Sequence, residues 1–406
     1  MDTAGTAHGK MAIQTAHYPH ELIGRLVTTG EAVRLTFTDE RITGIAPLPA
    51  NLDASLPWLG AGLVDLQVNG YAGWDFNATA PSADIVRGAV QALWREGVTT
   101  CLPTIITNTD AAITASLRAI ADARRADSRI ARTIAGVHLE GPFISPEDGA
   151  RGAHNRMAVC PPDWARFMHW QEAADGAIRL VTLSPEWPEA VPFIARCVAA
   201  HITVAIGHTV ATPDQISAAV AAGARLSTHL GNGAPPLLPR HPNILWEQLA
   251  HDDLWASVIG DGFHLPDTVL KVIIRVKGDH AFLVSDTVAL AGMPTGEYDT
   301  PVGGHVAVTP EGRLVLASDT RLLAGSICPL RRAVAHLVRS GVTDVPTAWA
   351  MASTRPARFL DLPVRAGLAV GAPADIVVWT GTGTQVTITQ TYKNGVLVSD
   401  HPEACS

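Results

Sequence analysis

The strongest constraint on the fold is a regular alternation of two kinds of segment between residues 63 and 286. Short, almost continuously apolar runs alternate there with longer segments in which apolar residues recur at helical spacing. Strands that are apolar on both faces are typical of parallel sheets covered by helices. The expected strands cover residues 63–70, 98–106, 134–143, 178–185, 203–208, 226–230, 255–262 and 281–286. Eight such repeats predict an α/β fold, a closed (β/α)₈ barrel of the TIM type.

Segments compatible with helices lie between most of these strands. They cover residues 82–96, 110–126, 187–200, 213–223 and 266–277. A further pair of helices, expected at 327–340 and 345–360, would connect the barrel to the tail of the chain. We therefore assign residues 61–362 to the barrel domain.

Both ends of the chain have a different character. Residues 21–60 and the tail, 363–406, are rich in β-branched residues and turn signals. We interpret them as one small β-sandwich domain assembled from both chain ends. Within the tail, Lys393-Asn394-Gly395 predicts a tight hairpin turn, because Asn-Gly accommodates the left-handed backbone that such turns need. Residues 1–20 are expected to be disordered.

The composition narrows the classes of function. Hydrophobic residues make up 47% of the 406 residues, which is enough for a large core and too many for a disordered chain. The 30 Lys and Arg residues are outnumbered by 38 Asp and Glu residues and form no basic block, which argues against nucleic acid or an anionic membrane as partner. No apolar run is long enough to span a bilayer, and the N-terminus lacks the layout of a secretory signal. Five scattered cysteines favour reduced thiols and a cytoplasmic location.

Polar residues at the ends of the predicted strands indicate the chemistry. Glu140, His208 and His229 lie at the ends of the third, fifth and sixth strands, and Asp286 at the end of the eighth. Catalytic groups of barrel enzymes project from the carboxyl ends of the strands. One carboxylate and two imidazoles match a catalytic divalent-metal site, which keeps a position for water and lowers the pKa of that water to about 7. Asp286 would accept the proton of this water and deliver it to a leaving nitrogen.

A lone histidine is more often structural than catalytic. His138, two residues before Glu140, is therefore expected to be structural, as are the histidines away from the strand ends. The argument for Glu140, His208, His229 and Asp286 depends on all of them falling at predicted strand ends.

A series of short motifs, in this order, resembles the N-acetylglucosamine-6-phosphate deacetylase family of the amidohydrolase superfamily. The motifs are Gln67-Val68-Asn69-Gly70, HLEGPF (138–143), GAHN (152–155), IGH (206–208), THLGNG (228–233), DGFH (261–264), VSD (284–286) and LAGS (323–326). The resemblance runs from about residue 60 to the GAPADIVV segment (371–378). HLEGP combined with the later GH, THL and SD elements is specific, whereas any one of them alone would be weak.

The resemblance implies metal-dependent deacetylation of an N-acetyl amino-sugar 6-phosphate, which releases acetate. It implies that Glu140, His208 and His229 hold the metal and that Asp286 is the general acid and base.

Many amidohydrolases also carry a His-x-His pair at the end of the first strand and bind a second metal there. This chain has Gln67 and Asn69 at those positions. Neutral amides are poor ligands beside imidazole. We therefore expect a remnant of a second metal site and one divalent ion per subunit, with zinc as the first choice and iron, manganese or cobalt as alternatives.

The resemblance also implies the contacts to the substrate. His154 corresponds to the family histidine that contacts the acetamide carbonyl, where it would polarise that oxygen. Arg240 lies where the family places an arginine that reaches a phosphate from the neighbouring subunit, which implies a homodimer. The other implied contacts to the sugar or its phosphate are Ala153, Asn232, Gly233, Asp261, His264, Leu323, Ala324 and Gly325.

Several departures from the family pattern lie at the sugar-phosphate end. Ala234 follows Asn232 and Gly233 where the family usually has Asn-Ala-Met, and the stretch 235–243 is unusually rich in proline. The substrate therefore stays open between an amino-sugar phosphate, an unphosphorylated amino sugar, and another small amide such as an N-acyl amino acid or a cyclic amide. A non-catalytic scaffold is a further alternative, but the complete set of ligands and the general base argue against it.

Overall fold

The computed structural model describes residues 20–49, 55–301 and 303–401. Eight parallel strands form one sheet and neighbour each other in chain order. They are β5 (Leu63–Val68), β8 (Val98–Ile106), β9 (Val137–Glu140), β10 (Ile178–Leu183), β11 (Thr203–Ile206), β12 (Leu226–Ser227), β13 (Trp255–Ile259) and β14 (Ala281–Val284). Each lies within its predicted range, which confirms the barrel. The disorder predicted for residues 1–20 concerns a segment that, except for His20, lies outside the described residues.

The sheet is nearly closed between its first and last strands. The N–H of Asp286, just after β14, donates to the Gln67 carbonyl of β5 at 2.8 Å, and the N–H of Asn69 donates to the Thr287 carbonyl at 2.8 Å. Every residue of β5 is buried, as expected for a strand covered on both faces. These bonds bring the segment after β5 beside the segment after β14, where Asp286 lies.

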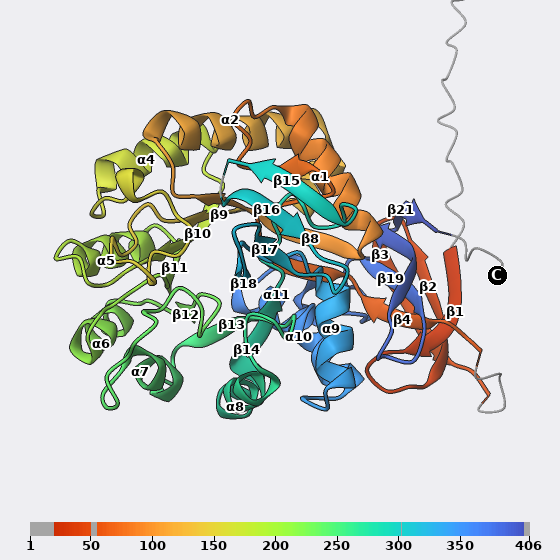
Figure 1. Ribbon diagram of the computed structural model, residues 1–406. Helices are drawn as coiled ribbons and strands as arrows, with labels where there is room; N and C mark the ends of the chain where they lie inside the picture. The colour runs from red at the N-terminus through yellow and green to blue at the C-terminus, as the bar shows by residue number, and fades with distance from the viewer. Residues whose placement is uncertain (1–19, 50–54, 302, 402–406) are drawn as a thin grey trace, which may run out of the picture.

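Helices cover the strands, most of them on the outside of the barrel, as Figure 1 shows. They are α1 (Ala83–Arg95), α2 (Asp110–Ala126), α3 (Ser128–Thr133), α4 (Trp164–Ala173), α5 (Ala190–Ala199), α6 (Pro213–Ala221), α7 (Ile244–Ala250), α8 (Asp267–Lys277), α9 (Leu330–Arg339), α10 (Val345–Met351) and α11 (Thr354–Phe359), with short 3₁₀ segments η1 (Arg156–Ala158), η2 (Gly278–His280) and η3 (Pro363–Ala366). Local sequence determines where several of these helices begin. Ser82 and Thr109 cap α1 and α2, and Thr212 forms a capping box with Gln215 in α6.

The two chain ends form a common seven-stranded sheet, which lies at the right of Figure 1. Its order is β21 (Val396–Asp400), β20 (Thr387–Lys393), β19 (Ile376–Thr380), β4 (Trp58–Ala61), β1 (His20–Leu26), β2 (Ala32–Thr38) and β3 (Arg41–Pro47). The predicted union of both ends in one β unit is thereby confirmed. The predicted hairpin is also present, with φ angles of 48° at Asn394 and 75° at Gly395. The exact domain boundaries stay a prediction.

A four-stranded antiparallel sheet between β14 and α9 was not predicted. It consists of β15 (Gly296–Thr300), β16 (Gly304–Val308), β17 (Leu314–Leu316) and β18 (Asp319–Leu323), and it is drawn in front of the barrel in Figure 1. No residue of β15 or β18 is fully buried, so neither strand has the continuous apolar run that revealed the barrel strands. A small β6 (Gly70–Tyr71) and β7 (Trp74–Asp75) pair follows β5.

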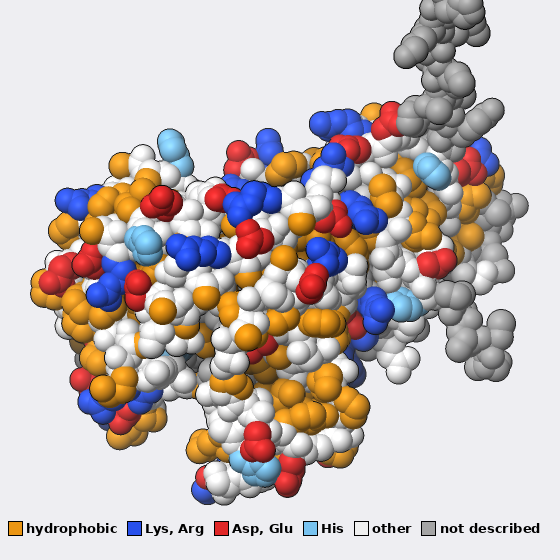
Figure 2. Space-filling view, turned by 90° about the horizontal axis from the view of Figure 1, so that it is seen from above, with side chains coloured by type: hydrophobic (Ala, Val, Ile, Leu, Met, Phe, Trp, Pro, Cys, Tyr) orange, Lys and Arg blue, Asp and Glu red, His pale blue; other side chains and the backbone are white. Residues whose placement is uncertain are grey.

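The described helices and the visible surface bear on the predicted partners. Among the residues that the structure describes, every helix is too short or too polar to cross a membrane. Figure 2 shows positive and negative side chains interspersed with apolar ones over the visible face, and no field of a single charge. This distribution agrees with the net charge of −8.

Candidate active site

The residues with predicted chemical roles lie at the carboxyl end of the barrel. Glu140 is the last residue of β9, and His208, His229 and Asp286 each follow a strand by two residues. The φ angles of these last three are 50°, 30° and 48°. Left-handed backbone at a non-glycine residue costs roughly 1–3 kcal/mol and is concentrated at functional sites. The strain therefore marks the three strand ends as places where the fold positions a side chain.

Three side-chain atoms converge at this end of the barrel. His229 Nε2 lies 3.1 Å from Glu140 Oε1 and 3.1 Å from His208 Nε2, and His208 Nε2 lies 3.4 Å from Glu140 Oε1. The His208 Nδ1 lies 2.8 Å from the Ala150 carbonyl, to which it donates its proton because a carbonyl only accepts. In the neutral form of His208 that donates from Nδ1, Nε2 carries no proton and can serve as a metal-ligand atom.

The electrostatics of this cluster couple the charge states of Glu140 and His229. Burial raises the pKa of Glu140, but the hydrogen bonds and charges of His208 and His229 hold it well below its usual value. Burial lowers the pKa of His229, but the hydrogen bond to Glu140 and its charge outweigh burial and raise it. Each partner thus stabilises a charged form of the other.

The donor set and its spacing fit a divalent metal ion. Zinc holds nitrogen and oxygen ligands at about 2.0–2.2 Å in a tetrahedron, so that the ligand atoms lie roughly 3.3 Å from one another. The separations of 3.1 to 3.4 Å between Glu140, His208 and His229 match that spacing. The bond from His208 to the Ala150 carbonyl is the kind of outer contact that fixes the tautomer of a metal ligand.

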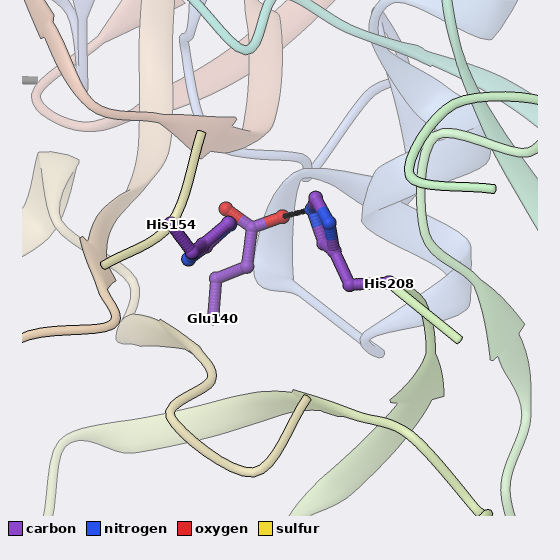
Figure 3. A group of neighbouring side chains, drawn as sticks. All are labelled: Glu140, His154 and His208. Carbon is purple, nitrogen blue, oxygen red and sulfur yellow. Dashed lines mark ion pairs between the residues drawn. The ribbon is translucent and has the colours of Figure 1, made fainter. Parts of the chain in front are cut away.

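His154 borders the same cluster. Figure 3 shows Glu140 between His154 and His208, and ligand atoms of these three residues lie within 4.8 Å of one another. Burial and the neighbouring His208 lower the pKa of His154 to about 3, so its ring is neutral near pH 7. His229 lies closer to Glu140 and His208 than this limit, which makes it the better third ligand.

Asp286 is held by the amide pair that replaces the usual histidines. Asn69 Nδ2 donates to Asp286 Oδ1 at 2.8 Å, and Gln67 Nε2 lies 3.3 Å from the same oxygen. Gln67 Nε2 also donates to Glu140 Oε1 at 2.7 Å. Burial and the negative charge of Glu140 raise the pKa of Asp286 to about 6. Gln67 and Asn69 therefore act here as hydrogen-bond donors to the two carboxylates.

His264 and Asp261 form a second polar pair near this cluster. The His264 Nδ1 lies 2.6 Å from Asp261 Oδ2, and Asp261 Oδ1 accepts the N–H groups of Phe263 and His264 at 2.8 and 2.9 Å. Burial opposes ionisation of Asp261, but its bonds to His264 lower its pKa. His264 in turn lowers the pKa of Asp286, which places its charge close to that carboxylate.

Two of the predicted substrate contacts adjoin the histidine cluster. Asn232 Nδ2 donates to the His229 carbonyl at 3.3 Å. Gly233 has a φ angle of 59°, and a Cβ atom there would lie 2.7 Å from His208 Nδ1. The close approach of its backbone to the ring explains why glycine occupies this position.

The other predicted contacts lie on loops. Ala153 and Arg240 are exposed, and no hydrogen bond joins the Arg240 guanidinium to another described residue. Leu323, the last residue of β18, is partly exposed, as are Ala324 and Gly325. The structure of one chain therefore brings the predicted metal ligands together but leaves Arg240 on the surface.

Sequence reasoning missed Thr107, which follows β8. Its Oγ1 lies 2.8 Å from His154 Nδ1 and 3.4 Å from the Glu140 carbonyl. A hydroxyl at a strand end was the available signal, but threonine is common in strands and so did not stand out. His138, which was expected to be structural, is buried with its Nε2 2.7 Å from Thr182 Oγ1.

Comparison with known proteins shows the family of this chain. The amidohydrolase family profile matches residues 58–398. The N-acetylglucosamine-6-phosphate deacetylase of Bacillus subtilis (strain 168) is 32% identical over 325 residues, which covers 78% of this chain and 79% of that protein. The chain belongs to the N-acetylglucosamine-6-phosphate deacetylase family of amidohydrolases. The predicted family and enzyme class are thereby confirmed.

Other members of this deacetylase family and its relatives are similarly close. An N-acetylgalactosamine-6-phosphate deacetylase of Shewanella sp. (strain ANA-3) is also 32% identical, over 79% of this chain and 78% of its own length. The crystal structure of N-acetyl-D-glucosamine-6-phosphate deacetylase from Mycobacterium smegmatis superposes with a TM-score of 0.81 at 28% identity, over 93% of this chain and all of that one. The fold of this chain is therefore that of a solved deacetylase structure.

Proposed function

We propose that the protein hydrolyses the acetamide of N-acetylglucosamine-6-phosphate to glucosamine-6-phosphate and acetate. The observation that supports this most strongly is the convergence of Glu140, His208 and His229 within 3.4 Å of one another. Asp286 lies next to them, because Gln67 donates to both carboxylates. The names of the family relatives supply the substrate class.

Glu140, His208 and His229 are the proposed ligands of one divalent metal ion per subunit. When bound, such an ion supplies Lewis acidity, which activates water near neutral pH and polarises a carbonyl oxygen. Zinc is the first choice, and iron, manganese and cobalt also suit one carboxylate and two imidazoles. A single ion is supported by the neighbouring amide pair, whose nitrogens already donate to carboxylates.

Asp286 is the proposed general base and acid. Its carboxylate takes a proton from the attacking water as the new C–O bond forms. It then gives this proton to the amide nitrogen as the C–N bond breaks, so that acetate and a free amine leave. A pKa raised to about 6 suits a group that carries out both transfers near neutral pH.

His154 is the proposed partner of the acetamide oxygen. The Thr107 hydroxyl has one proton, and its contact with His154 Nδ1 at 2.8 Å is shorter than its contact with the Glu140 carbonyl at 3.4 Å. We propose the tautomer in which the Thr107 hydroxyl donates to Nδ1 instead of to the more distant Glu140 carbonyl, so that the neutral ring of His154 carries its proton on Nε2. That N–H can then stabilise negative charge on the oxygen as water adds.

Phosphate recognition is assigned to His264 and Arg240, with Asp261 holding His264. Arg240 is exposed, and its guanidinium has no hydrogen-bond partner among the described residues, which supports a role across a homodimer interface, with Arg240 serving the neighbouring subunit's substrate. Ala153, Asn232, Gly233, Leu323, Ala324 and Gly325 are proposed to surround the sugar. The unpaired cysteines Cys101, Cys160, Cys197 and Cys328 support a cytoplasmic setting.

The C4 epimer is a second candidate substrate, because the Shewanella relative named for N-acetylgalactosamine-6-phosphate is equally similar at 32% identity. The test is acetate release from both N-acetylhexosamines, each with and without the 6-phosphate. We expect kcat/KM to be highest for N-acetylglucosamine-6-phosphate and at least tenfold lower without phosphate. A higher kcat/KM for N-acetylgalactosamine-6-phosphate would make that sugar the assigned substrate. Absence of acetate release from every sugar would refute the proposal.

A further inference from the structure

Glu186 lies outside the site that the sequence predicted, yet it connects the loops that carry that site. It follows β10 by three residues. Its Oε1 accepts the hydroxyl proton of Ser145 at 2.9 Å, and its Oε2 accepts the hydroxyl of Ser184 at 2.7 Å and the N–H of Val210 at 3.0 Å. One half-buried carboxylate thus joins the ends of three neighbouring barrel strands, β9, β10 and β11.

A second layer of bonds extends from Glu186 toward His208. Because Ser184 gives its only hydroxyl proton to Glu186, the Thr209 hydroxyl must donate in the 2.7 Å contact between Thr209 Oγ1 and Ser184 Oγ. The N–H of Ser145 donates to the His208 carbonyl at 2.9 Å. Hydrogen bonds therefore connect Glu186 to the segment around His208. Val210 bonds Glu186 directly, Thr209 bonds it through Ser184, and the His208 carbonyl is connected to it through Ser145.

His208 needs such support because of its backbone. Its φ angle of 50° lies in the left-handed region, which an isolated histidine disfavours. Strained backbone persists only where the surrounding structure over-determines it. The bonds through Ser145, Thr209 and Val210 supply this constraint at the carbonyl of His208 and at the two residues that follow it.

We propose that Glu186 is a positioning residue for the metal site, which fixes the backbone of His208 so that Nε2 faces Glu140 and His229. This inference rests on the proposed function, since it assigns Glu186 a role in the affinity of that site for its ion. Outer contacts that orient a ligand typically change metal affinity or activity by roughly 10–100-fold when they are removed.

The test is the binding of Co²⁺ to the metal-free full chain, followed by visible absorption, which reports both affinity and ligand geometry. Glu186→Ala should weaken Co²⁺ binding about 10–100-fold and alter the visible spectrum. Glu186→Gln keeps one acceptor oxygen, so its affinity for Co²⁺ should fall less than that of Glu186→Ala. The matched control is Glu189→Ala, because Glu189 is exposed at the start of α5 and its side chain makes no capping hydrogen bond.

The outcomes separate the two proposals. If wild type binds no Co²⁺, the proposed function fails. If wild type binds Co²⁺ and Glu186→Ala binds it with equal affinity and an equal spectrum, the role of Glu186 is wrong. If Glu186→Ala does not fold, Glu186→Gln and Ser145→Ala decide, and wild-type Co²⁺ binding by both would equally overturn the inference. Far-UV circular dichroism of the metal-free variants separates a local effect on His208 from general unfolding.

Discussion

The metal end and the phosphate end of the site are built in different ways. Glu140, His208 and His229 are buried at strand ends, where the barrel fixes their backbones and hydrogen bonds fix their rings. Arg240 lies on an exposed loop, and its guanidinium has no partner among the described residues. Under the proposed assignment, the bond-breaking chemistry depends on the fold of one subunit, whereas recognition depends on loops.

This difference explains where the chain departs from its family. The replacements after Asn232 and the proline-rich stretch 235–243 fall on the loop between β12 and α7, where Gly233 still adjoins the ring of His208. Loops tolerate changes that a packed strand end does not. A relative can thus change its sugar while it retains its hydrolysis, as two relatives named for different epimers at 32% identity suggest.

The largest effect is expected at the metal end. His208→Ala removes one of three proposed ligands from a buried cluster, so the protein should lose its metal and its activity together. Elemental analysis of the purified variant, beside acetate release, measures both. His169→Ala, on the exposed side of α4, is the control and should keep both. Retention of metal by His208→Ala would mean that the site has another ligand set.

Asp286→Asn should separate the chemistry from metal binding. The amide fills the same space but does not transfer protons, so kcat should fall by roughly 10²–10⁴-fold or more, since general acid–base catalysis contributes that much and one residue serves two steps. Metal content should stay at the wild-type level. A variant that keeps a tenth of wild-type kcat would show that another group transfers the proton.

The contrast between buried strand ends and loops also determined which site residues could be predicted from the sequence. Glu140, His208, His229 and Asp286 were found because each follows an apolar run whose end marks the mouth of a barrel. Thr107 and Glu186 were missed, because their roles come from hydrogen bonds between different strand ends and leave no local pattern.

The β15–β18 sheet was missed for another reason. Its strands are short, and β15 and β18 are mostly exposed and have no continuous apolar run, so the sheet is recognised only in the tertiary structure. The partner of Arg240 also could not be predicted, since an exposed loop side chain is not constrained by the packing of its own chain.

Arg240→Ala should affect recognition more than chemistry. A charge-assisted hydrogen bond contributes roughly 1.5–3 kcal/mol, or about tenfold to a hundredfold in kcat/KM. The loss should appear mainly in KM and only for the phosphorylated sugar, because the phosphate is remote from the amide. Arg118→Ala, an exposed residue of α2, is the control. Equal loss on phosphorylated and unphosphorylated sugars would indicate a structural role instead.

A smaller effect is expected for Thr107→Val, which keeps the shape of the side chain and removes its hydroxyl. His154 Nδ1 then loses its 2.8 Å partner, and the ring is free to adopt either tautomer. A neutral hydrogen bond contributes about 0.5–1.5 kcal/mol, so kcat should fall up to roughly tenfold with KM little changed. Thr107→Ser should restore it. A serine variant as slow as the valine variant would argue against the hydroxyl.

The central claim is that one divalent ion, held by Glu140, His208 and His229, is responsible for deacetylation. The most direct measurement is a titration in which a chelator removes the metal and Zn²⁺ is added back in steps, while acetate release from N-acetylglucosamine-6-phosphate is followed. The account predicts no activity without metal and a linear recovery that stops at one ion per chain. Full activity without metal, or recovery that continues to two ions per chain, would contradict it.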